Sequence, residues 1–147
     1  STIPGRVPGE LYDEDLEFLE RALAEAEGEH IMVCLHHHPV PIGCDWLDTQ
    51  IVASADQFFE VLDRHDRVRA VVWGHVHQEY DDERKGVKLF AVPSTCVQFK
   101  PGSEDFSVDD ANPGYRWFDL YEDGRLETGI SRVEGIDFEV DFSVKGY

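Results

Sequence analysis

Apolar and polar positions divide the first part of the chain into a helix followed by a strand. In residues 13–27, leucines and alanines recur at helical spacing behind acidic residues, and Gly28 follows as a stop signal. Residues 31–35, IMVCL, form a short unbroken apolar run, which is typical of a strand buried on both faces. The pattern therefore predicts a surface helix that leads into a buried strand.

A second helix and a second strand follow in the same order. We expect the helix to run from Ser54 to about His65, because Ser54 and Gln57 have the spacing of a capping box. Residues 70–73, AVVW, form another short apolar run that is stopped by a polar turn. A strand, a helix and a strand in this order predict a parallel pair with a right-handed crossover, so both strands should end at the same edge of the sheet.

The rest of the chain shows hairpin patterns around one long loop. Residues 78–92 have a charged turn at Lys85-Gly86, and residues 115–133 have Asp123-Gly124 between alternating runs. The intervening segment 93–114 is polar and rich in proline and glycine, and long loops of this kind are often functional. The fold class is thus α/β, changing to α+β at the C-terminal end, in a single domain over residues 1–147. The tail 135–147 fits either a partly ordered strand or an arm.

Charge and cysteine content narrow the range of partners. The chain has 31 acidic and 13 basic residues, a formal net charge of −18, which repels nucleic acid and anionic membrane surfaces. No apolar stretch approaches the roughly 20 residues needed to span a bilayer, and the start, STIPGRVPGE, reads like the middle of a longer protein. Three sparse cysteines, Cys34, Cys44 and Cys96, favour free thiols in a reducing cytoplasm.

Histidines follow both predicted strands of the parallel pair. His36–His38 come after the first strand, and His75 and His77 come after the second, so the two clusters should converge at one sheet edge. Neutral imidazole is the commonest transition-metal ligand in proteins. If the second segment stays extended, His75 and His77 project to the same side and can serve one metal ion or two. The sequence therefore predicts a metal site at this edge.

Other histidines give weaker patterns. His30 lies away from the two clusters, and we treat it as a surface residue. Asp63-Arg64-His65 spells D-x-H, a plausible pair of ligands, but it falls at the end of the second helix, where residues two apart do not face the same way. We therefore assign His65 to the surface as well.

Three stretches carry a family resemblance. LHHHPVPIGCDWLD, VVWGHVHQEYD and VPSTCVQFKPG resemble the C-terminal half of the class III cyclic nucleotide phosphodiesterases, within the calcineurin-like metallophosphoesterase superfamily. The likeness runs from about Gly9 to Tyr147, and the VPSTCVQFKPG stretch is closest to the enzymes that act on cyclic AMP. It implies one half of an αββα sandwich, with a mixed sheet that contains a βαβ unit followed by antiparallel hairpins.

The resemblance also implies a chemistry. In that family a hydroxide bridging two divalent ions opens 3',5'-cyclic AMP to 5'-AMP, and iron, manganese, cobalt and zinc all suit such sites. His36 and His75 would share one ion and His77 would bind the other. His37 is then a candidate catalytic or supporting residue, and His38, Thr95, Cys96 and Gln98 are candidates for substrate contacts, each with a structural role as its alternative. Glycerophosphodiesters or other phosphodiesters are alternative substrates.

The chain departs from the family in lacking its N-terminal motifs. No metal-binding D-x-H, no G-D and no G-N-H followed by an acid occurs in the right place, so only three of about seven expected ligands are present. We therefore expect the isolated chain to be inactive or nearly so. With two helices covering only one face of the strands, an apolar face should be left bare, which predicts a homo-oligomer and keeps a non-catalytic self-associating module as an alternative.

Overall fold

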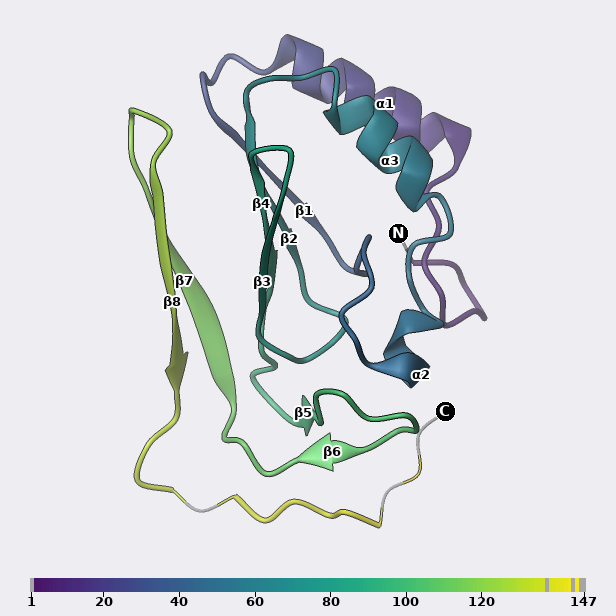
Figure 1. Ribbon diagram of the computed structural model, residues 1–147, viewed down its shortest axis with the longest axis vertical. Coiled ribbons are helices and arrows are strands. Elements are labelled where there is room, and N and C mark those ends of the chain that lie inside the picture. Colours follow the sequence, from purple (N-terminus) through teal and green to yellow (C-terminus); the bar gives the residue numbers. More distant parts are fainter. Residues whose placement is uncertain (1, 137, 144, 146–147) are drawn as a thin grey trace.

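A four-stranded mixed sheet forms the centre of the computed structural model, which describes residues 2–136, 138–143 and 145 (Figure 1). The strands are β1 (Ile31–Leu35), β2 (Val68–Trp73), β3 (Tyr80–Arg84) and β4 (Val87–Ala91), in the spatial order β1-β2-β4-β3. β2 pairs in parallel with both β1 and β4, and β3 pairs antiparallel with β4. Leu35, Trp73 and Ala91 lie in register, so the three parallel strands end together. The predicted parallel pair and the α/β class are confirmed.

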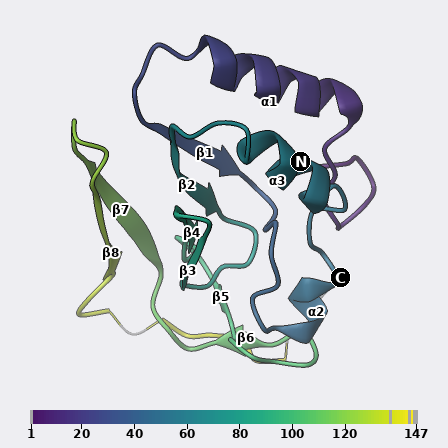
Figure 2. The ribbon, with the colours of Figure 1, turned by 45° about the horizontal axis from the view of Figure 1, so that its top comes forward.

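Helices cover one face of this sheet. The helices are α1 (Asp13–Glu25), α2 (Asp45–Asp48) and α3 (Ala55–Leu62). α1 and α3 lie side by side over the sheet (Figures 1 and 2). Leu23 of α1 and Phe58 and Leu62 of α3 are buried in one cluster with Val71 and Trp73 of β2. The short α2 lies near the edge where the parallel strands end (Figure 2).

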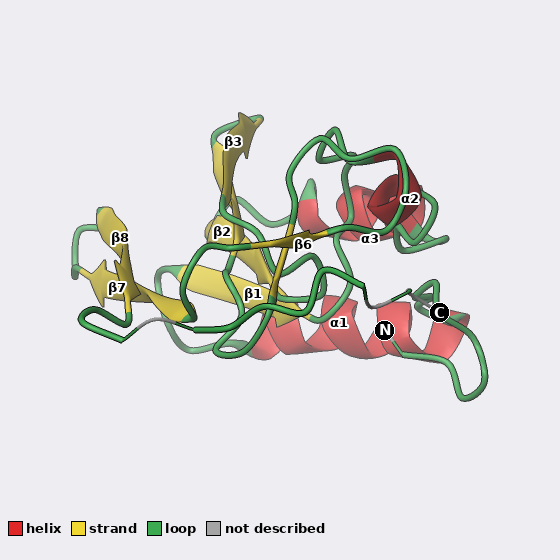
Figure 3. Cartoon of the chain, turned by 90° about the horizontal axis from the view of Figure 1, so that it is seen from below, coloured by secondary structure: helices red, strands yellow, loops and turns green. Residues whose placement is uncertain are grey.

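A β-hairpin covers the opposite face. It consists of β7 (Gly114–Leu120) and β8 (Leu126–Arg132), and it lies across the sheet from the helices (Figures 1 and 3). Phe118 and Leu126 pack on a second buried cluster formed by Ala70, Val72 and Phe90. The expectation of a bare apolar face is therefore wrong, because the hairpin folds back on the sheet. A bare apolar face therefore no longer supports self-association, which stays a prediction.

Several expected details of the strands and helices differ. β1 is the edge strand of its sheet, with Cys34 exposed and its neighbours only half-buried, so burial on both faces is wrong. An apolar run does not reveal whether a further strand lies beside it. α1 and α3 end earlier than expected, and no capping box forms at Ser54, because its hydroxyl accepts a hydrogen bond from the backbone N–H of Leu11 (2.7 Å).

The second half of the chain follows the predicted pattern closely. Both hairpins form, and their turns place Lys85, Gly86 and Gly124 in left-handed backbone conformations with φ of 51°, 83° and 82°. Before β7 begins at Gly114, the long segment contains only the two-residue strands β5 (Gln98–Phe99) and β6 (Val108–Asp109). Residues 137, 144, 146 and 147 of the predicted tail lie outside the described residues, and no strand forms in its described part. Among the described helices none is long and apolar enough to cross a membrane.

Arg67 fixes the end of α1. Its guanidinium donates hydrogen bonds to the backbone carbonyls of Leu23 (2.7 Å), Ala26 (2.7 Å) and Gly28 (2.8 Å). The last carbonyls of a helix have no partner within the helix and carry partial negative charge, which a fixed cation satisfies. No basic residue of α1 occupies its own last turn, so Arg67, which comes just before β2, supplies this charge from a distant part of the sequence.

We predict that Arg67→Met destabilises the fold by about 2 kcal/mol, because three hydrogen bonds from a charged donor are lost while much of the side-chain volume remains. Urea unfolding followed by circular dichroism measures the effect. Arg69→Met is the matched control, since among the described residues the Arg69 guanidinium bonds only to the nearby carbonyl of Asp66. Equal unfolding free energies for the two variants would contradict this role of Arg67.

Asp63 connects the end of α3 to the β3–β4 hairpin. Its carboxylate accepts hydrogen bonds from Arg84 (2.5 Å) and from the ammonium of Lys85 (2.7 Å). The guanidinium of Arg84 also lies over the ring of Phe59, 4.3 Å from its centroid. Hydrogen bonds from Arg84 and then Lys85 hold the pKa of Asp63 well below its usual range. The ionised form is therefore favoured in the folded protein.

Replacing Asp63 by Asn should cost about 1 kcal/mol at neutral pH, since the network is partly exposed. A carboxyl whose folded pKa is depressed stabilises the fold above its unfolded pKa near 4 and loses that contribution as the pH falls further. The difference in unfolding free energy between wild type and Asp63→Asn should thus stay constant above about pH 5 and shrink below about pH 4. Asp66→Asn is the control in the same loop, and a gap independent of pH would refute the assignment.

Candidate metal centre

The candidate site lies where the three parallel strands end. His36–His38 follow β1, His75 follows β2, and Thr95 and Cys96 lie in the loop after β4. Backbone hydrogen bonds join the first two turns, because the N–H groups of Gly74 and His75 both point to the carbonyl of His36 (3.2 and 2.9 Å). The carboxyl edge of a parallel sheet is the usual place for ligand sites in α/β folds. The predicted convergence of the two histidine clusters is observed.

Three imidazoles form a compact group. One ring nitrogen each from His36, His37 and His75 lies within 4.8 Å of the others. Nε2 of His36 and Nδ1 of His75 are 3.3 Å apart, and the rings of His37 and His75 have centroids 4.3 Å apart. Three nitrogen donors around one point form a ligand set that zinc and other transition metals accept. The residues therefore fit a divalent ion.

The local electrostatics keep these rings neutral. Burial, reinforced by the neighbouring histidines, lowers the pKa of His75 to about 3. Burial also lowers the pKa values of His36 and His37. A metal ion requires a deprotonated ring nitrogen, so low pKa values keep the lone pairs available for coordination at neutral pH.

His77 does not belong to the three-histidine group. It has a φ of 49°, a left-handed conformation uncommon outside glycine, so the segment is not extended. Its Nδ1–H donates to the carbonyl of Val97 (3.0 Å), and its ring lies flat on Phe99, with centroids 4.4 Å apart. The extended backbone on which a shared side of His75 and His77 depended is therefore not present, because the chain turns between them, and the shared side stays a prediction. His77 stays close by but outside the group.

His38 lies behind the group, fully buried. Its Nε2 is 3.7 Å from Oδ1 of Asp48. That oxygen accepts a hydrogen bond from the N–H of Ile42 (2.8 Å), and Oδ2 of Asp48 accepts one from the N–H of Gly43 (3.0 Å). Burial lowers the pKa of His38 to about 4, against the opposing effect of Asp48. A side chain in this position supports the turn after β1, and its burial does not favour the predicted substrate contact.

Thr95 and Cys96 are exposed and line a pocket of about 420 Å³ together with Phe106 and Phe138. The pocket adjoins His77, because Val97 lines it and also binds the His77 ring through its carbonyl. A contact of Thr95 and Cys96 with substrate stays a prediction.

Gln98 has a structural role instead. It is buried, and its amide bonds to the backbone of Ser94 and Cys96, so it fixes the shape of this loop. All three cysteines of the chain, Cys96 included, are free thiols.

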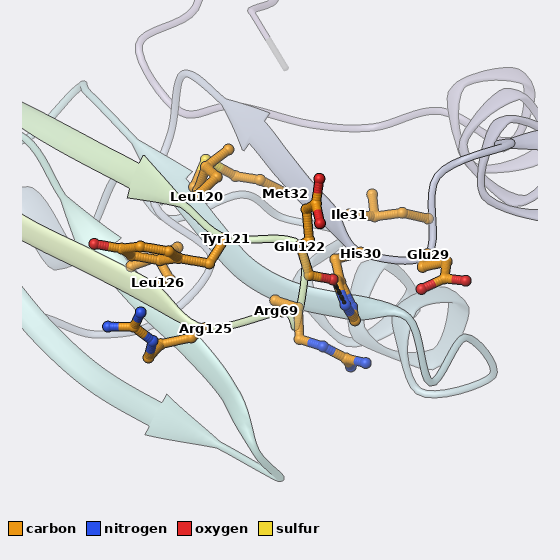
Figure 4. Close-up of a pocket in the computed structure, with 11 residues that line it drawn as sticks. Glu29, His30, Ile31, Met32, Arg69, Leu120, Tyr121, Glu122, Arg125 and Leu126 are labelled. Atoms are coloured by element: carbon orange, nitrogen blue, oxygen red, sulfur yellow. Dashed lines mark hydrogen bonds between the residues drawn. The ribbon is translucent and has the colours of Figure 1, made fainter.

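The other histidines bind elsewhere. His65 pairs with Glu20 (3.0 Å) while Asp63 faces the β3–β4 hairpin, so the D-x-H residues diverge as predicted. Nε2 of His30 donates to the carbonyl of Glu122 (3.1 Å). His30 lines a pocket of about 530 Å³ between the start of β1 and the tip of the β7–β8 hairpin (Figure 4). This pocket is at the opposite end of β1 from the histidine group, so it is separate from the candidate metal centre.

One residue at the site was not predicted from the sequence. Oε1 of Gln50, just after α2, lies 2.6 Å from Nε2 of His75. Glutamine has no general pattern that marks it as a partner of a metal ligand, and only its place shortly after the His36–His38 cluster hints at this contact.

Comparison with known proteins identifies relatives along the entire chain. It is 51% identical over all 147 residues to the 3',5'-cyclic adenosine monophosphate phosphodiesterase CpdA of Pseudomonas aeruginosa and 42% identical to that of Escherichia coli K12, each match covering 54% of the relative. A cyclic-nucleotide phosphodiesterase of Nostoc is 34% identical over 133 residues, covering 90% of this chain and 50% of the relative. The chain is a relative of the cyclic AMP phosphodiesterases. The resemblance expected from the sequence is confirmed, although no family model matches.

The relatives are longer than the chain, which spans about half their length. A solved structure of similar fold is a dimetal phosphatase from Danio rerio, with a TM-score of 0.54 and 18% identity over 84% of this chain and 37% of the other. This likeness supports the predicted fold, a mixed sheet with antiparallel hairpins.

The three-histidine group makes a sharp prediction about metal binding. His75→Ala removes one of three nitrogen donors and should weaken binding of Co²⁺ by more than about 100-fold, since even outer partners of metal ligands contribute 10-fold to 100-fold. His77→Ala should leave the affinity for the first ion nearly unchanged, because its ring lies outside the group. Visible absorption during Co²⁺ titration measures both, with His65→Ala as control. Equal losses in the His75 and His77 variants would show that the two rings share an ion.

Proposed function

We propose that this chain is the C-terminal half of a dinuclear metallophosphodiesterase that hydrolyses 3',5'-cyclic AMP to 5'-AMP. The observation that supports this most strongly is the meeting of His36, His37 and His75 at the carboxyl edge of the sheet. The similarity of the entire chain to cyclic AMP phosphodiesterases supports the substrate class. Glycerophosphodiesters and other phosphodiesters stay alternatives with less support, because these relatives are named for cyclic nucleotides.

The histidines have distinct tasks in this proposal. His36, His37 and His75 hold one ion, with His37 as a ligand in addition to the supporting role expected from the sequence. His77 contributes to a second ion and is held by Val97 and Phe99. When bound, divalent iron, manganese, cobalt or zinc ions supply a nucleophile and stabilise the charge that develops on the phosphoryl oxygens.

The protein's own groups would orient the substrate. Thr95 and Cys96 border the apolar pocket beside His77 and are placed to contact the nucleoside part of a cyclic nucleotide once its phosphate is at the histidines. His38 and Asp48 keep the turn between β1 and α2 in shape from within.

We expect the protein to work in the cytoplasm, where free thiols such as Cys34 and Cys96 persist.

A complete pair of metal sites needs ligands beyond these four histidines. Among the described residues, only the group of His36, His37 and His75 brings three candidate metal-binding side chains together. The second ion would therefore have too few ligands in this chain alone, and carboxylates from the other half of the domain would complete both sites. The isolated chain should for this reason bind metal but turn over substrate poorly.

We compare the 147-residue chain with an extended protein that also contains the residues encoded upstream of Ser1 in the source gene. Because a two-metal site acts as a unit, we predict that the 147-residue chain hydrolyses cyclic AMP at least about 1000-fold more slowly than the extended protein. Release of 5'-AMP in the presence of Mn²⁺ measures both rates. His75→Ala in the extended protein is the control for metal-dependent chemistry. Rapid hydrolysis by the short chain would refute the incomplete-site argument, and an inactive extended protein would refute the proposed substrate.

A further inference from the structure

Gln50 lies outside the three-histidine group, and its side chain contacts one member of that group, His75. Its Oε1 lies 2.6 Å from Nε2 of His75. The opposite end of the amide, Nε2 of Gln50, points toward the carbonyl of Trp46 at 3.5 Å. Turning the amide over would place its oxygen against that carbonyl, two acceptors facing each other, so the contacts favour the oxygen toward His75.

The orientation of the amide determines the proton on His75. A carbonyl oxygen only accepts hydrogen bonds, so Nε2 of His75 must carry the hydrogen and donate it to Gln50. In a neutral ring the other nitrogen, Nδ1, then has the lone pair. Nδ1 is the atom that faces Nε2 of His36 at 3.3 Å, inside the three-histidine group. Gln50 thus selects the tautomer in which His75 offers its lone pair to the group.

The position of Gln50 is itself fixed. Its backbone N–H bonds to the carbonyl of Leu47 (2.7 Å), which continues the turn of α2. α2 is anchored to the loop after β5, because Nε1 of Trp46 donates to the hydroxyl of Ser103 (3.1 Å). Two residues after Gln50, the N–H of Val52 bonds to the carbonyl of His38 (3.0 Å), so the segment is attached to the His36–His38 turn. The amide therefore meets His75 from a rigid support.

We propose that Gln50 is a positioning residue for the metal centre, holding His75 as the Nε2–H tautomer with Nδ1 directed at the ion. This inference rests on the proposed function, since it assumes that the three histidines bind metal. The role is indirect, because Gln50 acts through His75. It assigns α2 and the residues after it a part in the site that neither the sequence nor the family resemblance indicated.

Two readouts on the 147-residue chain test the proposal. Long-range ¹H–¹⁵N NMR of the metal-free protein should show His75 with its hydrogen on Nε2, and Gln50→Leu should shift His75 toward the Nδ1–H form. Co²⁺ titration should show 10-fold to 100-fold weaker binding for Gln50→Leu, the usual cost of losing an outer partner of a ligating histidine. Gln50→Glu keeps an acceptor oxygen and should restore both the tautomer and the affinity to near the wild-type level.

Controls separate this role from a general effect on folding. Gln57→Leu makes the same change at an exposed position of α3 and should alter neither readout. Circular dichroism identifies any variant that does not fold, and the Gln50→Glu protein then carries the comparison. An unchanged tautomer and unchanged Co²⁺ affinity in Gln50→Leu would overturn the proposal. If the wild type binds no Co²⁺, the proposed metal site fails, whereas the NMR measurement still decides whether Gln50 sets the tautomer.

Discussion

The shared register of β1, β2 and β4 is the constraint on which the site depends. Parallel strands in register end together, and the chain turns after Leu35, Trp73 and Ala91 at one edge of the sheet. The side chains that follow these strand ends therefore lie close together as soon as the strands pair. Hydrogen bonds from Gly74 and His75 to the carbonyl of His36 then fix the first two turns relative to each other. The position of the three-histidine group is thus a consequence of backbone pairing.

Much of this arrangement could be predicted from apolar runs and topology. Two short apolar segments separated by a helix specify a parallel pair, and a parallel pair specifies that His36 and His75 meet. The direction of each side chain could not be obtained in the same way. His77 depends on one left-handed backbone angle, and His38 depends on how far the turn after β1 folds inward. The His77 ring packs against Phe99, and His38 lies beside Asp48. Phe99 is distant in the sequence and Asp48 belongs to no general motif, so these contacts could not be predicted.

The same reasoning explains the errors about the sheet. Counting helices left one face of β2 and β4 without cover, but the β7–β8 hairpin returns to that face and buries Ala70, Val72 and Phe90. Arg116 strengthens the connection, because its guanidinium bonds to the carbonyl of Ala91 (3.0 Å) and pairs with Asp81 while lying over Phe90. Sequence patterns locate a hairpin well, whereas the surface on which it docks follows from the assembled sheet. The edge position of β1 likewise follows from the strand order β1-β2-β4-β3, which the apolar run of β1 does not specify.

The flat contact between the rings of His77 and Phe99 connects the histidines at the sheet edge with the loop that borders the apolar pocket. Phe99 belongs to β5, and the carbonyl of Val97 just before it holds the His77 ring, so the ring is attached to the loop that also borders the apolar pocket. A displacement of this loop would move His77 with it while leaving His36, His37 and His75 in place on their own turns. The position of the His77 ring relative to the three-histidine group is therefore tied to the shape of the pocket wall, so a molecule that binds in the pocket and displaces this loop would also displace His77.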